Sequence, residues 1–228
     1  MSRRPDLLEY YAARADEYEK VYAKPERKDD LARLHDAIPA YFVGRRVLEI
    51  ACGTGYWTRL IAPRAVHTTA CDLTLEVLTI ARLAQPEDDA VSFEVADAFN
   101  LDDVPGQFDA AFAGFWWSHV ELRDLPRFLG GLHARLEPGS RVMFVDNQYV
   151  DGSNWPVTRV DAAGNTYQRR TLDNGDEFDV LKNFPSADAL ETAIASAGGE
   201  NVAVVELLHY WCATYEVSER SARAARAR

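Results

Sequence analysis

Hydrophobic and polar residues follow two periods along the chain, one typical of buried strands and one typical of helices with a single apolar face. Short apolar or alternating runs, bounded by turn residues, predict five strands: Arg46–Cys52, Val66–Cys71, Val91–Val95, Phe108–Ala113 and Arg141–Val145. Helical spacing lies between them, at Tyr56–Ala62, Leu75–Leu83 and Leu125–Leu136. We expect Pro138-Gly139 to stop the third helix. This alternation favours a parallel sheet covered on both faces.

The second half of the chain departs from this alternation. Two β-prone runs, Arg169–Leu172 and Phe178–Phe184, flank Asp173-Asn174-Gly175 and predict a β-hairpin, because Asn-Gly accepts the positive φ of a tight turn. A helix is predicted over Ser186–Ala197, and two further strands over Val202–Glu216.

Composition and charge narrow the class of protein. The chain has 228 residues, 47 % hydrophobic and 27 % charged, which fits one globular domain. Lys and Arg total 25 against 36 Asp and Glu, and the net charge of −11 disfavours a nucleic-acid partner because it repels phosphate backbones. No apolar run is long enough for a membrane span, and no signal peptide is recognisable. The 3 cysteines predict free thiols in a reducing compartment, hence a cytoplasmic protein.

The first predicted strand leads into Glu49-Ile50-Ala51-Cys52-Gly53-Thr54-Gly55, which opens a helix. Glycines let the backbone approach a ligand closely, and a helix N-terminus offers unpaired N–H groups. A dinucleotide-binding loop of the G-x-G-x-x-G kind is the alternative, but Thr58 stands where its third glycine should be. The acid before the first glycine also points away from that alternative.

With these features the chain resembles the class I S-adenosylmethionine-dependent methyltransferases, in element order along almost its whole length. The specific motifs are Val47–Thr58, Asp72 after the second predicted strand, and Asp97-Ala98 after the third. The resemblance implies an α/β fold with a Rossmann-like seven-stranded sheet, an N-terminal helical lid and an inserted β-hairpin. It implies one domain over 1–228, with lid helices in 1–40, a cofactor-binding core in 41–150, a substrate-side hairpin in 165–185 and a C-terminal helix and strands in 186–217.

The resemblance also implies a cofactor, S-adenosylmethionine, which leaves as S-adenosylhomocysteine. Asp72 would bind both ribose hydroxyls, the side chain of Asp97 would accept from the adenine amino group, and the Ala98 N–H would meet the ring. The further cofactor-binding residues implied are Leu73 and Phe99 around the adenine, and Glu49, Ala51, Gly53 and Gly55 in the loop.

Within the class, the chain resembles small-molecule enzymes of the branch that includes the phosphonate O-methyltransferase of dehydrophos biosynthesis. Tyr10–Glu19, within an amphipathic helix predicted over Leu7–Tyr22, resembles their lid, and the hairpin resembles their insert. We expect Tyr18 and Trp57 to enclose the methionine portion, because a sulfonium cation is attracted to ring faces; plain packing is the alternative. Phe115, with Gly114, would offer backbone carbonyls to the ammonium group.

Trp116-Trp117-Ser118-His119 follows the fourth predicted strand, at the rim where an acceptor approaches. We expect Trp116 and His119 to bind the acceptor, and His119 to act as a general base because the pKa of imidazole is near neutral. A histidine bonded to backbone, or one that only orients the substrate, is the alternative. The Asn/Asp-Pro-Pro-aromatic sequence of nucleobase amino methyltransferases is absent here.

The predicted hairpin brings cations to one face. Phe178, Val180 and Lys182 share a face by strand alternation. A three-residue tip puts Arg170 on that face, and a two-residue tip puts Arg169 there; the resemblance favours Arg170. One Arg with Lys182 suggests an anion site, and a solvated hairpin with acidic surface partners is the alternative.

The sequence therefore predicts transfer of methyl from S-adenosylmethionine to an O or N atom of a small, anionic metabolite, with O-methylation of a carboxylate or phosphonate favoured. No metal site is expected. N-methylation of a heterocyclic or amine secondary metabolite is one alternative. A nicotinamide-dependent oxidoreductase, a catalytically silent cofactor-binding partner protein and a macromolecule methyltransferase are the others.

Overall fold

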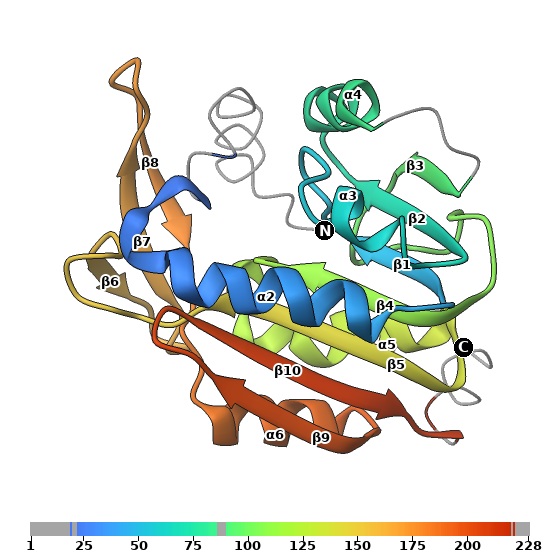
Figure 1. Cartoon of the computed structure of the whole chain (residues 1–228). Helices are drawn as coiled ribbons and strands as arrows, with labels where there is room; N and C mark the ends of the chain where they lie inside the picture. Colours follow the sequence, from blue (N-terminus) through green and yellow to red (C-terminus); the bar gives the residue numbers. More distant parts are fainter. Residues whose placement is uncertain (1–18, 20–21, 86–89, 220, 222–228) are drawn as a thin grey trace.

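The structure, a computed structural model, describes residues 19, 22–85, 90–219 and 221. A seven-stranded sheet lies at its centre, in the order β3-β2-β1-β4-β5-β10-β9 (Figure 1). The parallel strands are β1 (Arg46–Ile50), β2 (His67–Asp72), β3 (Val91–Val95), β4 (Phe108–Gly114) and β5 (Leu136–Asn147). β10 (Tyr210–Val217) runs antiparallel between β5 and β9 (Gly199–Glu206). The predicted Rossmann-like α/β fold is confirmed.

Helices cover both faces of this sheet, because successive residues of its central strands bury apolar side chains on opposite sides. Val47 of β1 packs in one core with α2 (Lys28–Tyr41) and α3 (Thr58–Ile61), and α4 (Leu75–Ala84) covers the same face. Leu48 packs in the other core with α5 (Leu125–Ala134) and α6 (Ala187–Ser196). Figure 1 shows α2 in front of the sheet and α5 behind it. No helix within the described ranges has the length and apolar character to cross a membrane.

The lid expected over Leu7–Tyr22 lies almost entirely outside the described residues. α2 belongs to the 1–40 segment assigned to lid helices, and it packs Leu34 and Ile38 into the core. One helical expectation is corrected. The helix expected to stop at Pro138-Gly139 ends at Ala134, and both of those residues lie inside β5. A register shift in the β4–β5 pairing accommodates them, since a bulge frees the proline from donating to the ladder.

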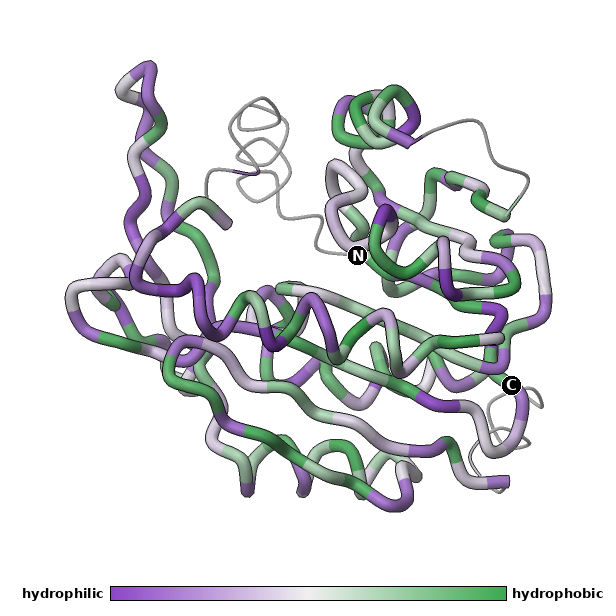
Figure 2. Tube along the Cα trace, viewed as in Figure 1, coloured by the Kyte–Doolittle hydropathy of each residue, from purple (hydrophilic) through white to green (hydrophobic). Residues whose placement is uncertain are grey.

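An insert between β5 and α6 forms a separate three-stranded sheet in the order β6-β7-β8. Its strands are β6 (Val157–Val160), β7 (Thr166–Thr171) and β8 (Glu177–Leu181). Figure 1 shows the β7–β8 hairpin as an arm projecting from the main sheet, and Figure 2 shows that the arm is mostly hydrophilic. The hairpin was predicted and β6 was not, because most of its side chains are exposed and give no buried period.

The structure also decides between the two hairpin registers. Arg170 pairs with Phe178, and the Leu172 N–H donates to the Asp176 carbonyl at 2.9 Å, which closes a three-residue tip. Arg170 therefore lies on the face of Lys182, and both side chains are buried, whereas Arg169 is exposed on the other face.

Short segments complete the connections. The 3-10 helices are η2 (Pro25–Arg27) before α2, and η3 (Trp117–His119) and η4 (Leu122–Asp124) between β4 and α5. Ser186 is the N-cap of α6, because its Oγ accepts the Ala189 N–H at 3.3 Å.

A buried histidine joins α5 to the last strand. His133 is 0 % exposed, and its Nε2 lies 2.8 Å from the Tyr215 hydroxyl, its Nδ1 2.9 Å from Ser221 Oγ. Since Ser221 Oγ donates to the Ala197 carbonyl at 3.0 Å, Nδ1–H is the donor to Ser221, and Nε2 accepts from Tyr215. Burial lowers the pKa of His133 from 6.5 to about 4.

This histidine predicts a pH-dependent loss of stability. Between pH 6.5 and 4 the unfolded chain binds a proton at His133 that the folded chain excludes, so stability falls as the pH falls through that window. From pH 7.5 to pH 5 we expect His133 to contribute a loss of about 2 kcal/mol. The measurement is urea unfolding of the wild type and of His133→Gln at both pH values. On acidification, the free energy of unfolding of the variant should fall by about 2 kcal/mol less than that of the wild type. Equal decreases in the two proteins would show that His133 is not the titrating group.

Candidate cofactor and acceptor site

The loops that follow the parallel strands meet at one edge of the sheet. The order β3-β2-β1-β4-β5 places β2 and β4 on opposite sides of β1, so the chain changes direction between β1 and β4. Ligands bind at such switch points, outside the carboxyl ends of the strands. The predicted cofactor residues after β1, β2, β3 and β4 all come to this edge.

The glycine-containing loop after β1 has a backbone that few side chains tolerate. Positive φ angles occur at Ala51 (51°), Gly53 (56°) and Gly55 (76°). A Cβ on Gly55 would lie 3.1 Å from the Cβ of Ala81, so this glycine also lets α4 pack closely. A positive φ at a non-glycine residue costs free energy, and such strain is concentrated at functional sites.

Glu49 lies beneath this loop. Its side chain is 1 % exposed and accepts a hydrogen bond from Thr58 Oγ1 at 2.7 Å, which ties β1 to the first turn of α3. Burial raises the pKa of Glu49 to about 8, and the hydrogen bond from Thr58 opposes that rise.

Asp72, the last residue of β2, is oriented by two backbone donors. Its Oδ2 accepts the Gly53 N–H at 3.0 Å, and its Oδ1 accepts the Thr74 N–H at 2.9 Å. Burial raises the pKa of this carboxyl, and the two hydrogen bonds oppose the rise. The structure thus joins two predicted cofactor residues, Asp72 and Gly53, directly.

The residues after β3 form a tight turn. Asp97 Oδ1 accepts the Phe99 N–H at 2.9 Å, and the Asp97 carbonyl accepts the Asn100 N–H at 2.8 Å. Ala98 is buried, and Leu73, which directly follows the neighbouring strand β2, is 40 % exposed. The ring of Phe99 lies 6.2 Å from that of Trp116, which links the predicted adenine side to the acceptor side.

Aromatic rings gather beside the loop. Trp57 is 3 % exposed and lies against Gly114, where a Cβ would approach its Cδ1 to 3.0 Å. Tyr22 stacks on Tyr56 at 3.8 Å, and its ring lies 5.7 Å from that of Phe115. Phe115 has a φ of 61°. Tyr18 lies outside the described residues.

His119 is held at the acceptor rim by a defined hydrogen bond. Its Nδ1 lies 2.7 Å from the Leu181 carbonyl, which can only accept, so Nδ1 carries the proton and the lone pair of the neutral ring is on Nε2. The side chain is 6 % exposed. Beside it, the Trp116 Nε1 is buried with no hydrogen-bond partner among the described residues.

Lys182 lies next to this rim in a buried ion pair. Its Nζ donates to Asp146 Oδ1 at 2.7 Å and to Ser118 Oγ at 2.6 Å. Asp146 is 0 % exposed and also accepts the Ser118 N–H at 2.9 Å. Burial lowers the pKa of Lys182 to about 8; Asp146 opposes this, and the charge of Arg170 adds to it. Arg170 itself donates to Gln168 Oε1 at 2.9 Å.

Sequence reasoning missed two polar residues of this region, Asp146 and Arg27. Asp146 follows the apolar run Val142–Val145 near the end of β5, much as Asp72 follows apolar residues at the end of β2, and that position was a usable signal. Arg27 precedes α2 and is 2 % exposed, and nothing in its local sequence indicates burial.

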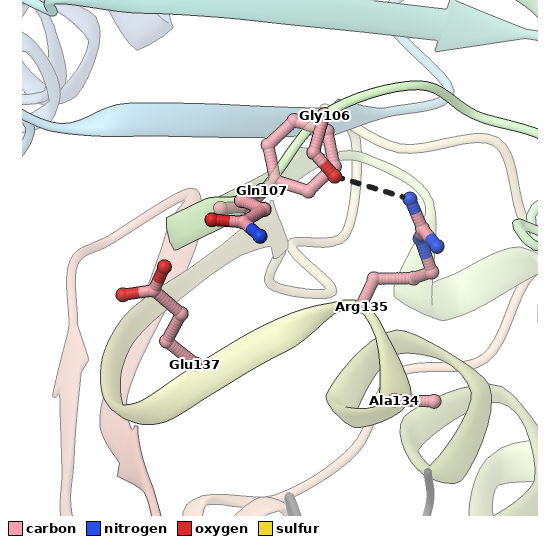
Figure 3. Close-up of a pocket in the computed structure, with 6 residues that line it drawn as sticks. Gly106, Gln107, Ala134, Arg135 and Glu137 are labelled. Carbon is pink, nitrogen blue, oxygen red and sulfur yellow. Dashed lines mark hydrogen bonds between the residues drawn. The ribbon is translucent and has the colours of Figure 1, made fainter.

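A second hollow lies away from this site. It has a volume of about 300 Å³ and is lined by Gly106, Gln107, Phe108, Ala134, Arg135 and Glu137 (Figure 3). β4 begins at Phe108 and β5 begins at Leu136, so the hollow is at the amino edge of the sheet, opposite the candidate site. Arg135 donates there to the carbonyls of Val104 and Gly106.

The fold and the loops at its carboxyl edge define a class. A family model described as a methyltransferase domain matches residues 47–139. A relative of known structure is 30 % identical in sequence, and this chain covers 96 % of that relative's length. The chain belongs to the class I S-adenosylmethionine-dependent methyltransferases, and S-adenosylmethionine is its cofactor.

The individual relatives sharpen this assignment. The solved relative, described as "DhpI-SAH complex structure", superposes with a TM-score of 0.75 over 93 % of this chain. A "DhpI-SAM-HEP complex" is 29 % identical, covers 94 % of this chain and 99 % of its own, and also has a TM-score of 0.75. The resemblance to the DhpI branch is thereby confirmed.

Curated relatives match over shorter spans. The biotin biosynthesis bifunctional protein BioHC of Cellvibrio japonicus is 28 % identical over 178 residues, which are 77 % of this chain and 32 % of that protein. A ubiquinone biosynthesis O-methyltransferase of Pseudomonas aeruginosa is 30 % identical over 128 residues, 51 % of this chain and 54 % of that protein. The matches thus span about a third and about half of these relatives.

Proposed function

We propose that the protein transfers the methyl group of S-adenosylmethionine to an oxygen or nitrogen of a small, anionic metabolite, with O-methylation of a carboxylate or phosphonate favoured. The observation that carries the anionic acceptor is the buried position of Lys182 and Arg170 on one face, beside His119. Two buried cations on one face favour an anionic ligand, and Asp146 is the counter-charge of Lys182. The phosphonate O-methyltransferase branch that the sequence resembles supports the same choice.

The residues at the carboxyl edge fit the cofactor. Asp72 presents a carboxyl already oriented by backbone N–H groups, which suits a ribose with two hydroxyl donors. The remaining residues proposed to contact the cofactor are Tyr18, Glu49, Ala51, Gly53, Gly55, Trp57, Leu73, Asp97, Ala98, Phe99 and Phe115. When bound, the cofactor supplies an electrophilic methyl group, whose bond to sulfur breaks with its electron pair as an acceptor lone pair bonds to carbon.

This chain's own residues then position the acceptor. Trp116 would form the apolar wall of the acceptor site, while Lys182 and Arg170 would orient the anionic group. His119 Nε2 carries the lone pair that accepts a proton when the acceptor is a hydroxyl or amine; an ionised carboxylate or phosphonate needs no such base. Alignment of donor and acceptor supplies most of the acceleration, an effect that reaches about 7–11 kcal/mol.

A paired substitution on the hairpin tests the proposal. Release of S-adenosylhomocysteine is first measured over a panel of carboxylates, phosphonates, and neutral alcohols and amines. For the best acceptor, we expect Arg170→Gln to raise KM about tenfold to a hundredfold, because a buried charge-assisted hydrogen bond is lost. Arg169→Gln, the same change on the exposed face, should leave KM unchanged.

Two results would contradict the proposal. One is a panel in which only neutral compounds are methylated. The other is an equal KM for Arg170→Gln and Arg169→Gln, provided that both variants keep the circular dichroism spectrum and S-adenosylhomocysteine affinity of the wild type.

A further inference from the structure

We infer that Arg27 and the hydroxyl of Tyr210 are acceptor-binding residues, which contact the anionic group of the acceptor from the side opposite Lys182. The inference rests on the proposed function and adds to it a second set of contacts, from outside the insert. Arg27 ends η2, and Tyr210 begins β10, so neither residue belongs to the hairpin. Figure 1 shows the start of α2, just after Arg27, at the same end of the sheet as the β7–β8 arm.

Arg27 is a buried cation whose hydrogen bonds within the described part of the chain go to neutral acceptors. Its Nε donates to Ser153 Oγ at 3.0 Å, its Nη2 to the Ser153 carbonyl at 3.1 Å, and its Nη1 to Asn147 Oδ1 at 3.3 Å. None of the ion pairs among the described residues includes Arg27. A guanidinium that is 2 % exposed is costly without a negative partner, so an anion is the missing component.

The nearby carboxylates are engaged elsewhere. Glu26 is exposed, and its carboxylate accepts its hydrogen bond from the Ser153 hydroxyl, at 2.9 Å from Oε1, and forms no ion pair with Arg27 among the described residues. Asp30 is buried, but its Oδ2 accepts the His209 N–H at 2.7 Å and lies 3.4 Å from the His209 ring nitrogen.

Tyr210 supplies a second, independent observation. Its side chain is 0 % exposed, and its hydroxyl has no hydrogen-bond partner among the described residues. The guanidinium carbon of Arg27 lies 5.7 Å from the centre of its ring, and the ring of Phe115 lies 5.7 Å away on the cofactor side. A buried hydroxyl without a partner is destabilising, and a bound acceptor between the cofactor and Arg27 would satisfy it.

The end of β5 explains how two sets of donors meet. Asp146 binds Lys182, and the next residue, Asn147, binds Arg27. Successive residues of a strand point to opposite faces, so the two cations flank the end of β5 from opposite sides. They are close enough that the charge of Arg27 helps to lower the pKa of Lys182.

Donors on two sides suit a group with oxygens pointing in several directions. A planar carboxylate presents two oxygens in one plane, whereas a tetrahedral phosphonate or phosphate presents three and carries a second negative charge. We therefore expect Arg27 and Tyr210 to select a doubly charged tetrahedral group over a singly charged one.

The test uses two small anions of the same shape. Methylphosphonate is doubly charged at pH 8.5 and methanesulfonate is singly charged, and each is titrated calorimetrically into the protein saturated with S-adenosylhomocysteine. We expect the wild type to prefer methylphosphonate. Arg27→Gln should weaken methylphosphonate binding at least about tenfold, and Tyr210→Phe several-fold, with less effect on methanesulfonate. Arg27→Lys should recover part of the lost affinity for methylphosphonate. Arg33 is an exposed arginine of α2, and Arg33→Gln should bind methylphosphonate as tightly as the wild type does.

The outcomes separate the two proposals. Wild-type protein that prefers methylphosphonate, with Arg27→Gln and Tyr210→Phe binding it equally well, overturns the role of Arg27 and Tyr210 and leaves the anionic acceptor standing. Wild-type protein that binds S-adenosylhomocysteine but neither anion overturns both. If Arg27→Gln does not fold, Tyr210→Phe, which removes only an unpaired hydroxyl, decides the matter alone.

Discussion

Asp72→Ala is expected to reduce the affinity for S-adenosylhomocysteine by at least about a hundredfold, because a carboxylate that accepts from two ribose hydroxyls contributes about 1.5–3 kcal/mol per hydrogen bond. The carboxyl is prepared for this role before any ligand arrives, since the Gly53 and Thr74 N–H groups fix its orientation at 3.0 and 2.9 Å. Little ordering of the side chain is then needed on binding. Isothermal titration calorimetry measures the affinity directly.

The same hydrogen bonds require a control, because removal of Asp72 also frees the Gly53 N–H. Asp72→Asn keeps the shape of the side chain and one acceptor oxygen, and we expect an intermediate affinity. Asp36→Ala, an exposed carboxylate of α2, should bind as the wild type does. An unchanged affinity in folded Asp72→Ala would contradict the ribose assignment and, with it, the proposed placement of the cofactor.

The main sheet and the loops at its carboxyl edge could be predicted from the sequence, for a physical reason. Each central strand is a short apolar run that ends at or shortly before a glycine or an acid, and such runs are buried on both faces of a parallel sheet. Asp72 and Asp97 end up at one edge because the carboxyl ends of parallel strands meet there. The local sequence pattern is therefore enough to predict where these residues lie.

Long-range contacts account for what the sequence did not reveal. Pro138-Gly139 is a strong stop signal, yet here it forms a bulge inside β5, which only the pairing with β4 can decide. The partner of Lys182 is Asp146, 36 residues earlier in the chain, and those of Arg27 are 120 and 126 residues later. No local period encodes such a distance.

Asp146→Asn is expected to destabilise the protein by about 3–5 kcal/mol, because it leaves the ammonium of Lys182 buried without its counter-charge. Lys182 and Asp146 are 5 % and 0 % exposed, so water cannot replace the lost partner. Urea unfolding at pH 7 gives the difference in free energy of unfolding. The same variant should also lose acceptor binding, since Asp146 holds Lys182 and the Ser118 N–H in place.

The exposed pair on the insert is the matched control. Arg159 and Asp179 lie 3.0 Å apart with side chains 46 % and 38 % exposed, so Asp179→Asn should cost no more than about 1 kcal/mol. Adding Lys182→Met to Asp146→Asn should restore most of the stability, because no unpaired charge remains buried. If Asp146→Asn costs as little as Asp179→Asn, the buried pair is not what stabilises this end of the sheet.

The pH dependence of the stability of Asp146→Asn gives a second test of the buried ion pair. Burial already lowers the pKa of Lys182 in the folded wild type to about 8, from 10.5 in the unfolded chain, and loss of Asp146 lowers it further. A basic group with a lowered folded pKa makes stability rise with pH up to the unfolded value. The deficit of Asp146→Asn should therefore narrow as the pH rises from 7 to about 9, where Lys182 of the folded wild type also loses its proton, and stay constant above that. A deficit caused by lost packing would not change over this range.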